Sequence, residues 1–280
     1  MSAPTERPAS FDFRDETVIV TGGAAGLGRR IAERFAAAGA SVVVADHDGD
    51  QARQTASELS GAYGKTVPFH VDVTDEAQVG ELIEFATGWT GSLSVLVNNA
   101  GTSTPGQVIE ELDVAAWRRV IDVNLTGPFL TSRAALGVMR RAGYGKIVNI
   151  ASVAAKRISS NLAASYTASK AGLVAFTRHL AYEAAPFGIN VNAVCPGPVD
   201  APMLHRNVSP EALAARVASI PAGRLTTADD QAEAVLFLAS ASAAMINGVA
   251  LDVDGGALLG WYDVATYYER RTGSPPGRDS

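Results

Sequence analysis

The chain has 280 residues, enough for one large α/β domain or two small ones, and 47% of them are hydrophobic while 19% are charged. That composition is typical of a globular protein with a sizeable buried core. The net charge is −6 and no basic block that would follow a phosphate backbone occurs, which argues against a nucleic-acid partner. A single cysteine, Cys195, excludes an internal disulfide and suits a reducing compartment.

The first ten residues carry prolines and charges but no apolar segment, so they lack the pattern of a secretory signal. No apolar run reaches the about 18 residues that a membrane-spanning helix needs. We therefore expect a soluble, cytoplasmic protein without a membrane partner.

From Thr17 onward, short β-branched runs alternate with longer alanine-rich segments of helical periodicity. The valine run in 41–45 lacks polar alternation, which predicts a strand covered on both faces. In chain order we predict a strand at 17–21, a helix at 26–38, a strand at 41–45, a helix at 50–59, a strand at 67–71, a helix that starts at 74–76, a strand at 94–98, a helix at 114–141, a strand at 146–151, a helix at 165–185, a strand at 189–195, a helix at 228–240 and a strand at 249–253.

Seven strands joined by helical crossovers predict an α/β fold with a single doubly wound, Rossmann-like domain, whose seven-stranded parallel sheet is flanked by helices on both faces. We place this domain at 15–256, after an N-terminal extension (1–14) and before a C-terminal tail (257–280). A proline-rich interruption at about 196–221 is the predicted substrate loop. The end of the tail, from Gly273, cannot form a core and is predicted to be disordered.

A glycine-rich turn, Thr21 to Gly28, connects the first strand to the first helix. Gly22, Gly26 and Gly28 permit a tight turn and let a pyrophosphate approach the free N–H groups at the start of the helix. The spacing is wider than G-x-G-x-x-G, and an ordinary strand-to-helix turn is the alternative. The strand before it and the helix after it favour a dinucleotide site.

Asp46 ends the second predicted strand, twenty residues after Gly26. A carboxylate at this place can accept hydrogen bonds from both ribose hydroxyls of an adenosine and would repel a 2′-phosphate. Its neighbours are His47 and Asp48, with no lysine or arginine beside it. The cofactor is therefore predicted to be NAD, with a solvated loop aspartate as the alternative reading of Asp46.

Tyr166 and Lys170 stand four residues apart at the start of a predicted helix, so both side chains lie on one face. A tyrosine titrates near pH 10, and its use as a base near neutrality needs a shift of roughly three units. We expect the neighbouring ammonium, together with a positively charged nicotinamide, to supply this shift. Ser152, just after a predicted strand, is placed to hold a substrate oxygen beside the tyrosine.

These residues, with Asn98–Asn99–Ala100–Gly101 and Asn124, make the chain resemble the short-chain dehydrogenase/reductase family of the single-domain type, over about Asp15 to Gly256. The resemblance implies that Tyr166 is the general acid/base, that Lys170 assists it and binds the nicotinamide ribose, and that Ser152 stabilises the reacting oxygen. It implies that Asn124 kinks its helix and anchors a water relay. The implied cofactor contacts are Gly22, Gly26, Leu27, Gly28, Asp46, Asp72, Val73, Asn98, Ala100, Gly101, Tyr166, Lys170, Pro196, Gly197 and Val199, whereas Asn99 is expected to bridge strands.

One position departs from the pattern of many relatives, in which a threonine that helps to hold the carboxamide stands where this chain has Ala201. The apolar residues Met203, Leu204, Val208 and Leu213 favour an apolar or alicyclic substrate. Three basic residues, Lys156, Arg157 and His205, are further candidates for substrate contacts, with solvated surface as the alternative. The four histidines lack metal-ligand spacing, so no metal site is predicted.

The expected function is NAD-dependent hydride transfer between the nicotinamide and a secondary alcohol or ketone. The alternatives are a 3-oxoacyl thioester reductase and a non-catalytic NAD-binding regulatory protein. The resemblance also implies a homo-oligomer, with a tetramer favoured. The aromatic residues Trp261, Tyr262, Tyr267 and Tyr268 of the tail are expected to pack on a neighbouring subunit or to shape the mouth of the pocket.

Overall fold

Seven parallel strands form one sheet in the order β3-β2-β1-β4-β5-β6-β7. The computed structural model describes residues 11–159, 161–200, 209–260 and 263–275. The strands are β1 (Thr17–Thr21), β2 (Ser41–Asp46), β3 (Thr66–His70), β4 (Val95–Asn98), β5 (Gly145–Ile150), β6 (Ile189–Pro196) and β7 (Ala250–Val253). Strand order reverses between β1 and β4, where ligands of such folds bind. The predicted fold is confirmed.

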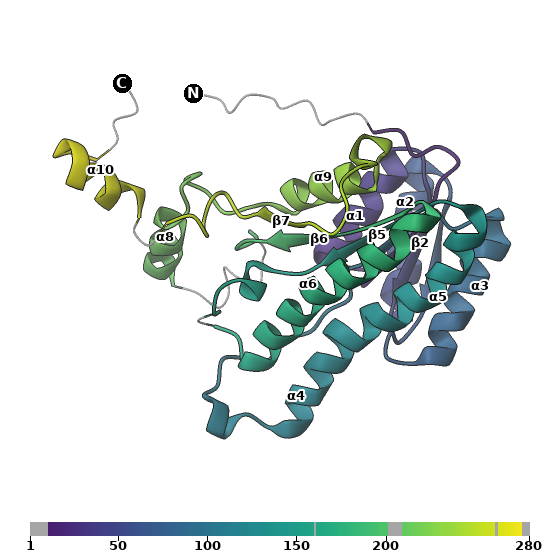
Figure 1. Cartoon of the computed structure of the whole chain (residues 1–280), viewed down its shortest axis with the longest axis horizontal. Helices are drawn as coiled ribbons and strands as arrows, with labels where there is room; N and C mark the ends of the chain where they lie inside the picture. Colours follow the sequence, from purple (N-terminus) through teal and green to yellow (C-terminus); the bar gives the residue numbers. More distant parts are fainter. Residues whose placement is uncertain (1–10, 160, 201–208, 261–262, 276–280) are drawn as a thin grey trace.

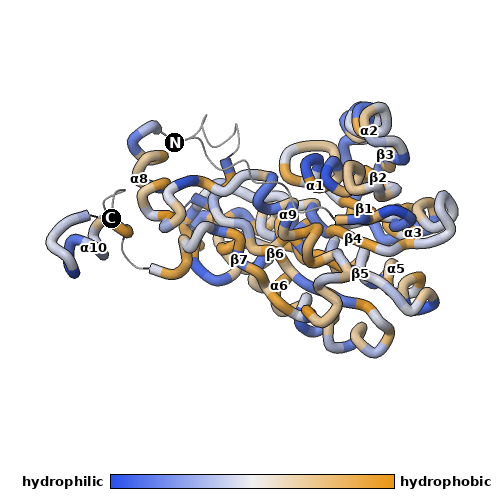
Figure 2. The backbone as a smooth tube through the Cα atoms, turned by 90° about the horizontal axis from the view of Figure 1, so that it is seen from above, coloured by the Kyte–Doolittle hydropathy of each residue, from blue (hydrophilic) through white to orange (hydrophobic). Residues whose placement is uncertain are grey.

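Helices cover both faces of the sheet (Figure 1). On one face α1 (Gly26–Ala37), α2 (Gly49–Tyr63) and α9 (Ala228–Ala239) pack on alternate strand residues such as Val18 and Val20. On the other face α3 (Glu76–Thr90), α5 (Gly127–Ala142) and α6 (Ala164–Ala184) pack on the residues between them, such as Ile19. Side chains along a strand point alternately to the two faces of the sheet, and helices cover both faces. Residues of both sets are therefore mainly apolar, and the central strands are mainly hydrophobic (Figure 2).

The predicted helix at 114–141 is interrupted. It consists of α4 (Val114–Ile121), one π-helical turn over Asp122–Thr126, and α5. Asn124 lies in this turn, fully buried, and its side-chain amide bonds outside its own helix. A π-helical turn of this kind re-aims one residue without ending the helix. Helical periodicity predicted one continuous helix and could not show the π-helical turn at Asn124, while the implied kink stays a prediction.

Two helices lie where no helix was predicted: α8 (Pro210–Ala218) in the proline-rich region and α10 (Val264–Thr272) in the tail. Each begins at a capping side chain, Ser209 or Asp263, that accepts a hydrogen bond from the backbone N–H three residues later. Phe13, assigned to the N-terminal extension, belongs to the core, since its ring packs edge-on against Phe35. Among the described residues, no helix is both long enough and apolar enough to cross a membrane.

Candidate active site

A cavity of about 870 Å³ lies along the carboxyl ends of β1, β2, β3 and β4. It brings together four of the segments that the sequence singled out: the glycine turn, the end of β2, residues 71–74 and residues 99–102. Its lining residues are Gly22, Ala25, Leu27, Gly28, Asp46, His47, Val71, Asp72, Val73, Thr74, Asn99, Ala100, Gly101, Thr102, Ala115, Arg118, Arg119, Asp122 and Val123.

The glycine turn leaves the start of α1 open to this cavity. Ala25 precedes the helix without a side-chain cap, and the first turn holds no acidic residue, so backbone N–H groups are available to an anion. Gly22 has a φ of +62°, and a Cβ there would lie 2.9 Å from the Cα of Ala100. A Cβ at Gly28 would lie 2.0 Å from the carbonyl oxygen of Gly22. Only glycine fits at these two positions, and the geometry suits a pyrophosphate.

Asp46 is buried at the end of β2, and backbone groups hold both of its carboxylate oxygens. Oδ2 accepts a hydrogen bond from the N–H of Ala24 at 3.0 Å, and Oδ1 accepts one from the N–H of Asp48 at 3.1 Å. The His47 ring nitrogen Nδ1 lies 2.9 Å from Oδ1. Each carboxylate oxygen can accept two hydrogen bonds, so acceptor capacity remains for ribose hydroxyls.

The residues predicted to react lie at the next strand end. Ser152 follows β5, and Tyr166 and Lys170 lie in the first two turns of α6. Ser152 and Lys170 are buried, and Tyr166 is partly buried. The Ser152 side chain is near enough to the Tyr166 hydroxyl to lower the pKa of the phenol, and its own hydroxyl accepts a hydrogen bond from the N–H of Ala154 at 3.0 Å. Lys170 Nζ donates to the carbonyl oxygen of Ile150 at 2.7 Å and lies 5.8 Å from the centre of the Tyr166 ring. One hydroxyl pair therefore stands beside one ammonium.

Gly101 joins this group to the cavity. Gly101 lines the cavity, and a Cβ at that position would lie 3.6 Å from Lys170 Nζ and 3.5 Å from Asn124 Oδ1, so both polar atoms lie directly behind this part of the wall. Asn124 accepts a hydrogen bond from the N–H of Thr102 at 2.7 Å and donates one to Ser169 Oγ at 3.1 Å. The side chain of Asn124 thereby ties the π-helical turn to the β4 end and to α6.

Burial dominates the electrostatics of the reactive pair. It raises the pKa of Tyr166, while the hydrogen bond with Ser152 lowers it. Burial also lowers the pKa of Lys170 from 10.5 to about 8. Burial outweighs the contribution of Ser152, so the pKa of this phenol is raised overall. That Lys170 and a positively charged nicotinamide together lower it stays a prediction.

Asn98 was predicted to line the cofactor site, but its side chain forms hydrogen bonds inside the protein instead. The amide donates to Ser132 Oγ and Asn149 Oδ1 and accepts from Thr131 Oγ1, all inside the protein. The cavity is lined by Asn99 instead. Asn99 Nδ2 donates to the carbonyl oxygens of Thr21 and Gly22, as its bridging role requires.

Thr21 is a residue of this site that the sequence interpretation missed. Its Oγ1 accepts hydrogen bonds from the N–H groups of Asn99 at 3.0 Å and Ala100 at 3.1 Å, so it fixes the β4 end against the glycine turn. A threonine at the end of a β-branched strand carries no sequence signal for such a contact, because strand propensity alone explains it.

The carboxyl end of β6 lies at the same edge of the sheet as the end of β5. Gly197 donates its N–H to Val253 at 3.0 Å, and a Cβ there would lie 2.7 Å from the Cα of Asp254. Val199 forms a β-bridge with Thr226. Ala201, the departure from the carboxamide contact, lies outside the described residues, as do Trp261 and Tyr262. The same holds for the residues expected near the substrate, Met203, Leu204, His205 and Val208. In the described ranges, no three His, Cys, Asp or Glu side chains are grouped to hold a metal.

Comparison with known proteins agrees with this geometry. The family model described as enoyl-(acyl carrier protein) reductase matches residues 22–257. The chain is 42% identical over 244 residues to cis-4-hydroxycyclohexanecarboxylate dehydrogenase of Sinomonas cyclohexanicum, covering 87% of this chain and 97% of that protein. It is 38% identical over 249 residues to 3-oxoacyl-[acyl-carrier-protein] reductase of Escherichia coli strain K12, covering 89% of this chain and 100% of the relative.

A solved structure has a similar fold. The crystal structure of a short-chain type dehydrogenase/reductase from Mycobacterium marinum superposes with a TM-score of 0.84 at 32% identity, covering 90% of this chain and 98% of that one. The chain belongs to the short-chain dehydrogenase/reductase family, a family of oxidoreductases that generally use a nicotinamide cofactor.

Proposed function

We propose that this protein is an NAD-dependent oxidoreductase that transfers a hydride between the nicotinamide and a secondary alcohol or ketone. The observation that carries the proposal is the grouping of Ser152 and Tyr166 beside the Lys170 ammonium, which lies behind Gly101 on the cavity wall. A proton acceptor, a donor to the substrate oxygen and a fixed positive charge are the groups that alcohol oxidation requires.

In the oxidation direction, Tyr166 as phenolate takes the proton from the substrate hydroxyl while the hydride leaves the same carbon atom. Ser152 donates a hydrogen bond to the substrate oxygen, which fixes that oxygen beside the phenol. Lys170 holds a ribose hydroxyl with its ammonium, and Asn124 with its neighbours keeps α6 in place. The bound nicotinamide, when present, supplies the hydride acceptor. In ketone reduction Tyr166 gives the proton back.

The raised pKa of Tyr166 supports an ordered reaction. Burial disfavours the phenolate, so an additional positive charge beside the phenol would favour it. An oxidised nicotinamide ring carries that charge. NAD is therefore expected to bind first, and the alcohol second.

The preference for NAD over NADP rests on Asp46. Its carboxylate is buried, held by two backbone N–H groups, and exposed to the cavity on one side. A fixed negative charge there accepts hydrogen bonds from ribose hydroxyls and repels a 2′-phosphate.

The substrate is proposed to be apolar or alicyclic. Ile220, Leu225 and Ala257 form a small buried apolar cluster with Leu213 and Val217 packed on it, at the side of the sheet where β6 and β7 end. A relative at 42% identity is named for oxidation of a hydroxycyclohexane carboxylate, which is an alicyclic secondary alcohol. We propose the same broad class here.

A 3-oxoacyl thioester reductase is the second candidate. The family model's name and the 38% identical Escherichia coli relative both favour it. A non-catalytic NAD-binding role is disfavoured because Asn124, Ser152, Tyr166 and Lys170 are all present. Initial rates separate these roles: we expect NAD-dependent oxidation of cyclohexanols to exceed NADPH-dependent reduction of an acetoacetyl thioester. The reverse order supports the reductase, and turnover of neither supports the regulatory role.

We also propose a cytoplasmic homo-oligomer, with a tetramer favoured. Large apolar side chains are exposed on three neighbouring helices, Trp117 on α4, Phe129 on α5 and Tyr182 on α6, which is typical of a surface that another subunit covers. Light scattering of the purified protein is expected to give a mass of four chains, and a mass of one chain would contradict the proposal.

A further inference from the structure

Arg157 belongs to the loop that follows Ser152, and its side chain reaches the loop after β7. The short helical turn Val153–Ala155 begins directly at Ser152, and the N–H of Arg157 donates to the carbonyl oxygen of Val153 at 3.0 Å. Arg157 Nη1 donates to the carbonyl oxygen of Ala257 at 3.0 Å. Because β5, β6 and β7 are parallel neighbours, Ser152 and Ala257 follow strands that end at the same edge of the sheet. The guanidinium therefore lies at the edge that carries Ser152.

Apolar surface adjoins this guanidinium. Ala257 belongs to the buried cluster with Ile220 and Leu225, the cluster assigned above to the substrate. Close to Arg157 and Ala257 in the chain, the large apolar side chains of Ile158 and Leu259 are 84% and 86% exposed. A molecule with an apolar body and an anionic end would cover such side chains and place its anion on the guanidinium.

Lys156, the other basic residue of this loop, is already neutralised. Its Nζ donates to Asp252 Oδ1 at 2.6 Å and to the carbonyl oxygen of Ala250 at 2.9 Å, which ties the loop to β7. Asp254, on the loop after β7, accepts hydrogen bonds from two backbone N–H groups of its own loop. The carboxylates of Asp252 and Asp254 therefore have partners other than Arg157.

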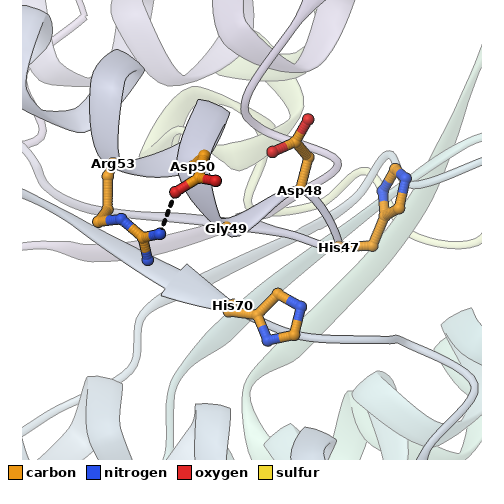
Figure 3. A pocket seen from close by; sticks show the side chains of 6 residues that line it. All are labelled: His47, Asp48, Gly49, Asp50, Arg53 and His70. Atoms are coloured by element: carbon orange, nitrogen blue, oxygen red, sulfur yellow. Dashed lines mark hydrogen bonds and ion pairs between the residues drawn. The ribbon is translucent and has the colours of Figure 1, made fainter.

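Arg157 differs from the arginines that a carboxylate holds. Arg53, for example, forms an ion pair with Asp50 in a cavity of about 550 Å³ beside the ends of β2 and β3 (Figure 3). Arg157 forms no ion pair with the part of the chain that the structure describes, and its bond to Ala257 uses one of its several N–H groups. The guanidinium thus keeps its charge and enough donors to bind a carboxylate through two parallel hydrogen bonds.

We propose that Arg157 binds a carboxylate on the substrate, so that the protein oxidises an alicyclic hydroxy acid in preference to a neutral alcohol. The substrate's hydroxyl lies at Ser152 and Tyr166, its ring covers the apolar side chains, and its carboxylate accepts hydrogen bonds from the guanidinium. The carboxylate is remote from the reacting carbon atom, so Arg157 acts on binding and orientation and takes no part in the transfer of the hydride or the proton. The inference rests on the proposed oxidation of an alicyclic alcohol.

The test compares two substrates in steady-state kinetics with NAD: a cyclohexanol that carries a carboxylate at the opposite ring position, and the carboxamide of the same compound. The two have nearly the same shape, so the ratio of their kcat/KM values reports the charge. We expect this ratio to fall by about tenfold in Arg157→Gln relative to wild type, mainly through KM, since hydrogen bonds between charged groups are lost. Arg157→Lys keeps the charge without the planar fork and should recover part of the ratio.

Lys156→Gln is the matched control, since it removes a neighbouring positive charge that Asp252 already neutralises. We expect it to change kcat/KM for both substrates alike and to keep the ratio of the wild type. An unchanged ratio in Arg157→Gln, the same fall in both variants, or a wild type that prefers the carboxamide would overturn the inference, while turnover of the carboxamide upholds the proposed function. Wild-type protein that oxidises neither compound would overturn the proposed function, and the inference with it.

Discussion

The ammonium of Lys170 donates a hydrogen bond to the carbonyl oxygen of Ile150 at 2.7 Å, inside the protein and between α6 and the end of β5. This bond ties the helix that carries Tyr166 to the strand that leads into Ser152. The buried cation is costly: its pKa falls from 10.5 to about 8. The lysine is thus a positioned charge that the fold retains at the expense of stability.

The pH dependence of stability reports this expense. The folded pKa of Lys170 lies below the unfolded value, so the penalty is complete below about pH 8 and is relieved as the pH rises to 10.5. We expect the free energy of unfolding of wild type, relative to Lys170→Met, to rise by up to about 3 kcal/mol between pH 7 and 10.5. Urea unfolding at several pH values measures it. A pH-independent difference would contradict the shift.

Gly28→Ala is expected to destabilise the protein and to abolish cofactor binding. The new Cβ would stand 2.0 Å from the carbonyl oxygen of Gly22 and 2.4 Å from Asn99 Nδ2, so the turn that receives the pyrophosphate must move. The matched control is Gly80→Ala in α3, where a Cβ meets nothing within 4 Å. That control should gain up to about 1 kcal/mol. Thermal unfolding with and without NAD compares the two, and unchanged NAD binding in Gly28→Ala would refute the pyrophosphate site.

Asp46→Asn replaces a charged acceptor by a neutral amide at the end of β2. We expect NAD affinity to fall by roughly tenfold, because hydrogen bonds to a charged group contribute more than neutral ones. NADP affinity should fall less or rise, since the repulsion is gone. The ratio of kcat/KM for the two cofactors measures the change. An unaltered ratio would show that Asp46 does not choose the cofactor.

Ser152→Ala removes the donor to the substrate oxygen and to Tyr166. We expect kcat to fall by roughly 100- to 1000-fold, as for the loss of one oxyanion donor. The hydrogen bond from Ser152 lowers the pKa of Tyr166, so its loss should move the acidic limb of the pH–rate profile of alcohol oxidation to higher pH. Ser152→Thr should restore part of the rate and of the profile. A loss of rate without movement of the acidic limb would show that Ser152 does not affect the pKa of Tyr166.

The sequence predicted the strands well because parallel strands that are covered on both faces are mostly apolar, without polar alternation. The run 41–45 was predicted to within one residue of β2 for that reason. Helices α8 and α10 were missed because each is short, with no buried residue to give an apolar stripe.

The details of the site depend on relations that the sequence does not contain. Asn98 and Asn99 are neighbours of the same type, and only the direction in which β4 presents each side chain decides that Asn99 faces the cavity. The direction of the pKa shift of Tyr166 depends on how deeply α6 and its surroundings bury the phenol. The spacing of Tyr166 and Lys170 predicted that they share a helix face, but it could not predict how far the phenol is buried.

The assignment of Tyr166 as the acid/base is tested most directly by Tyr166→Phe, assayed for alcohol oxidation and titrated with NAD in parallel. Phenylalanine keeps the ring of Tyr166 and removes only its hydroxyl group. We predict a loss of turnover of at least about 1000-fold, within the range of acid–base catalysis, with a dissociation constant for NAD within about threefold of wild type. Turnover at the wild-type rate by this variant would contradict the assignment.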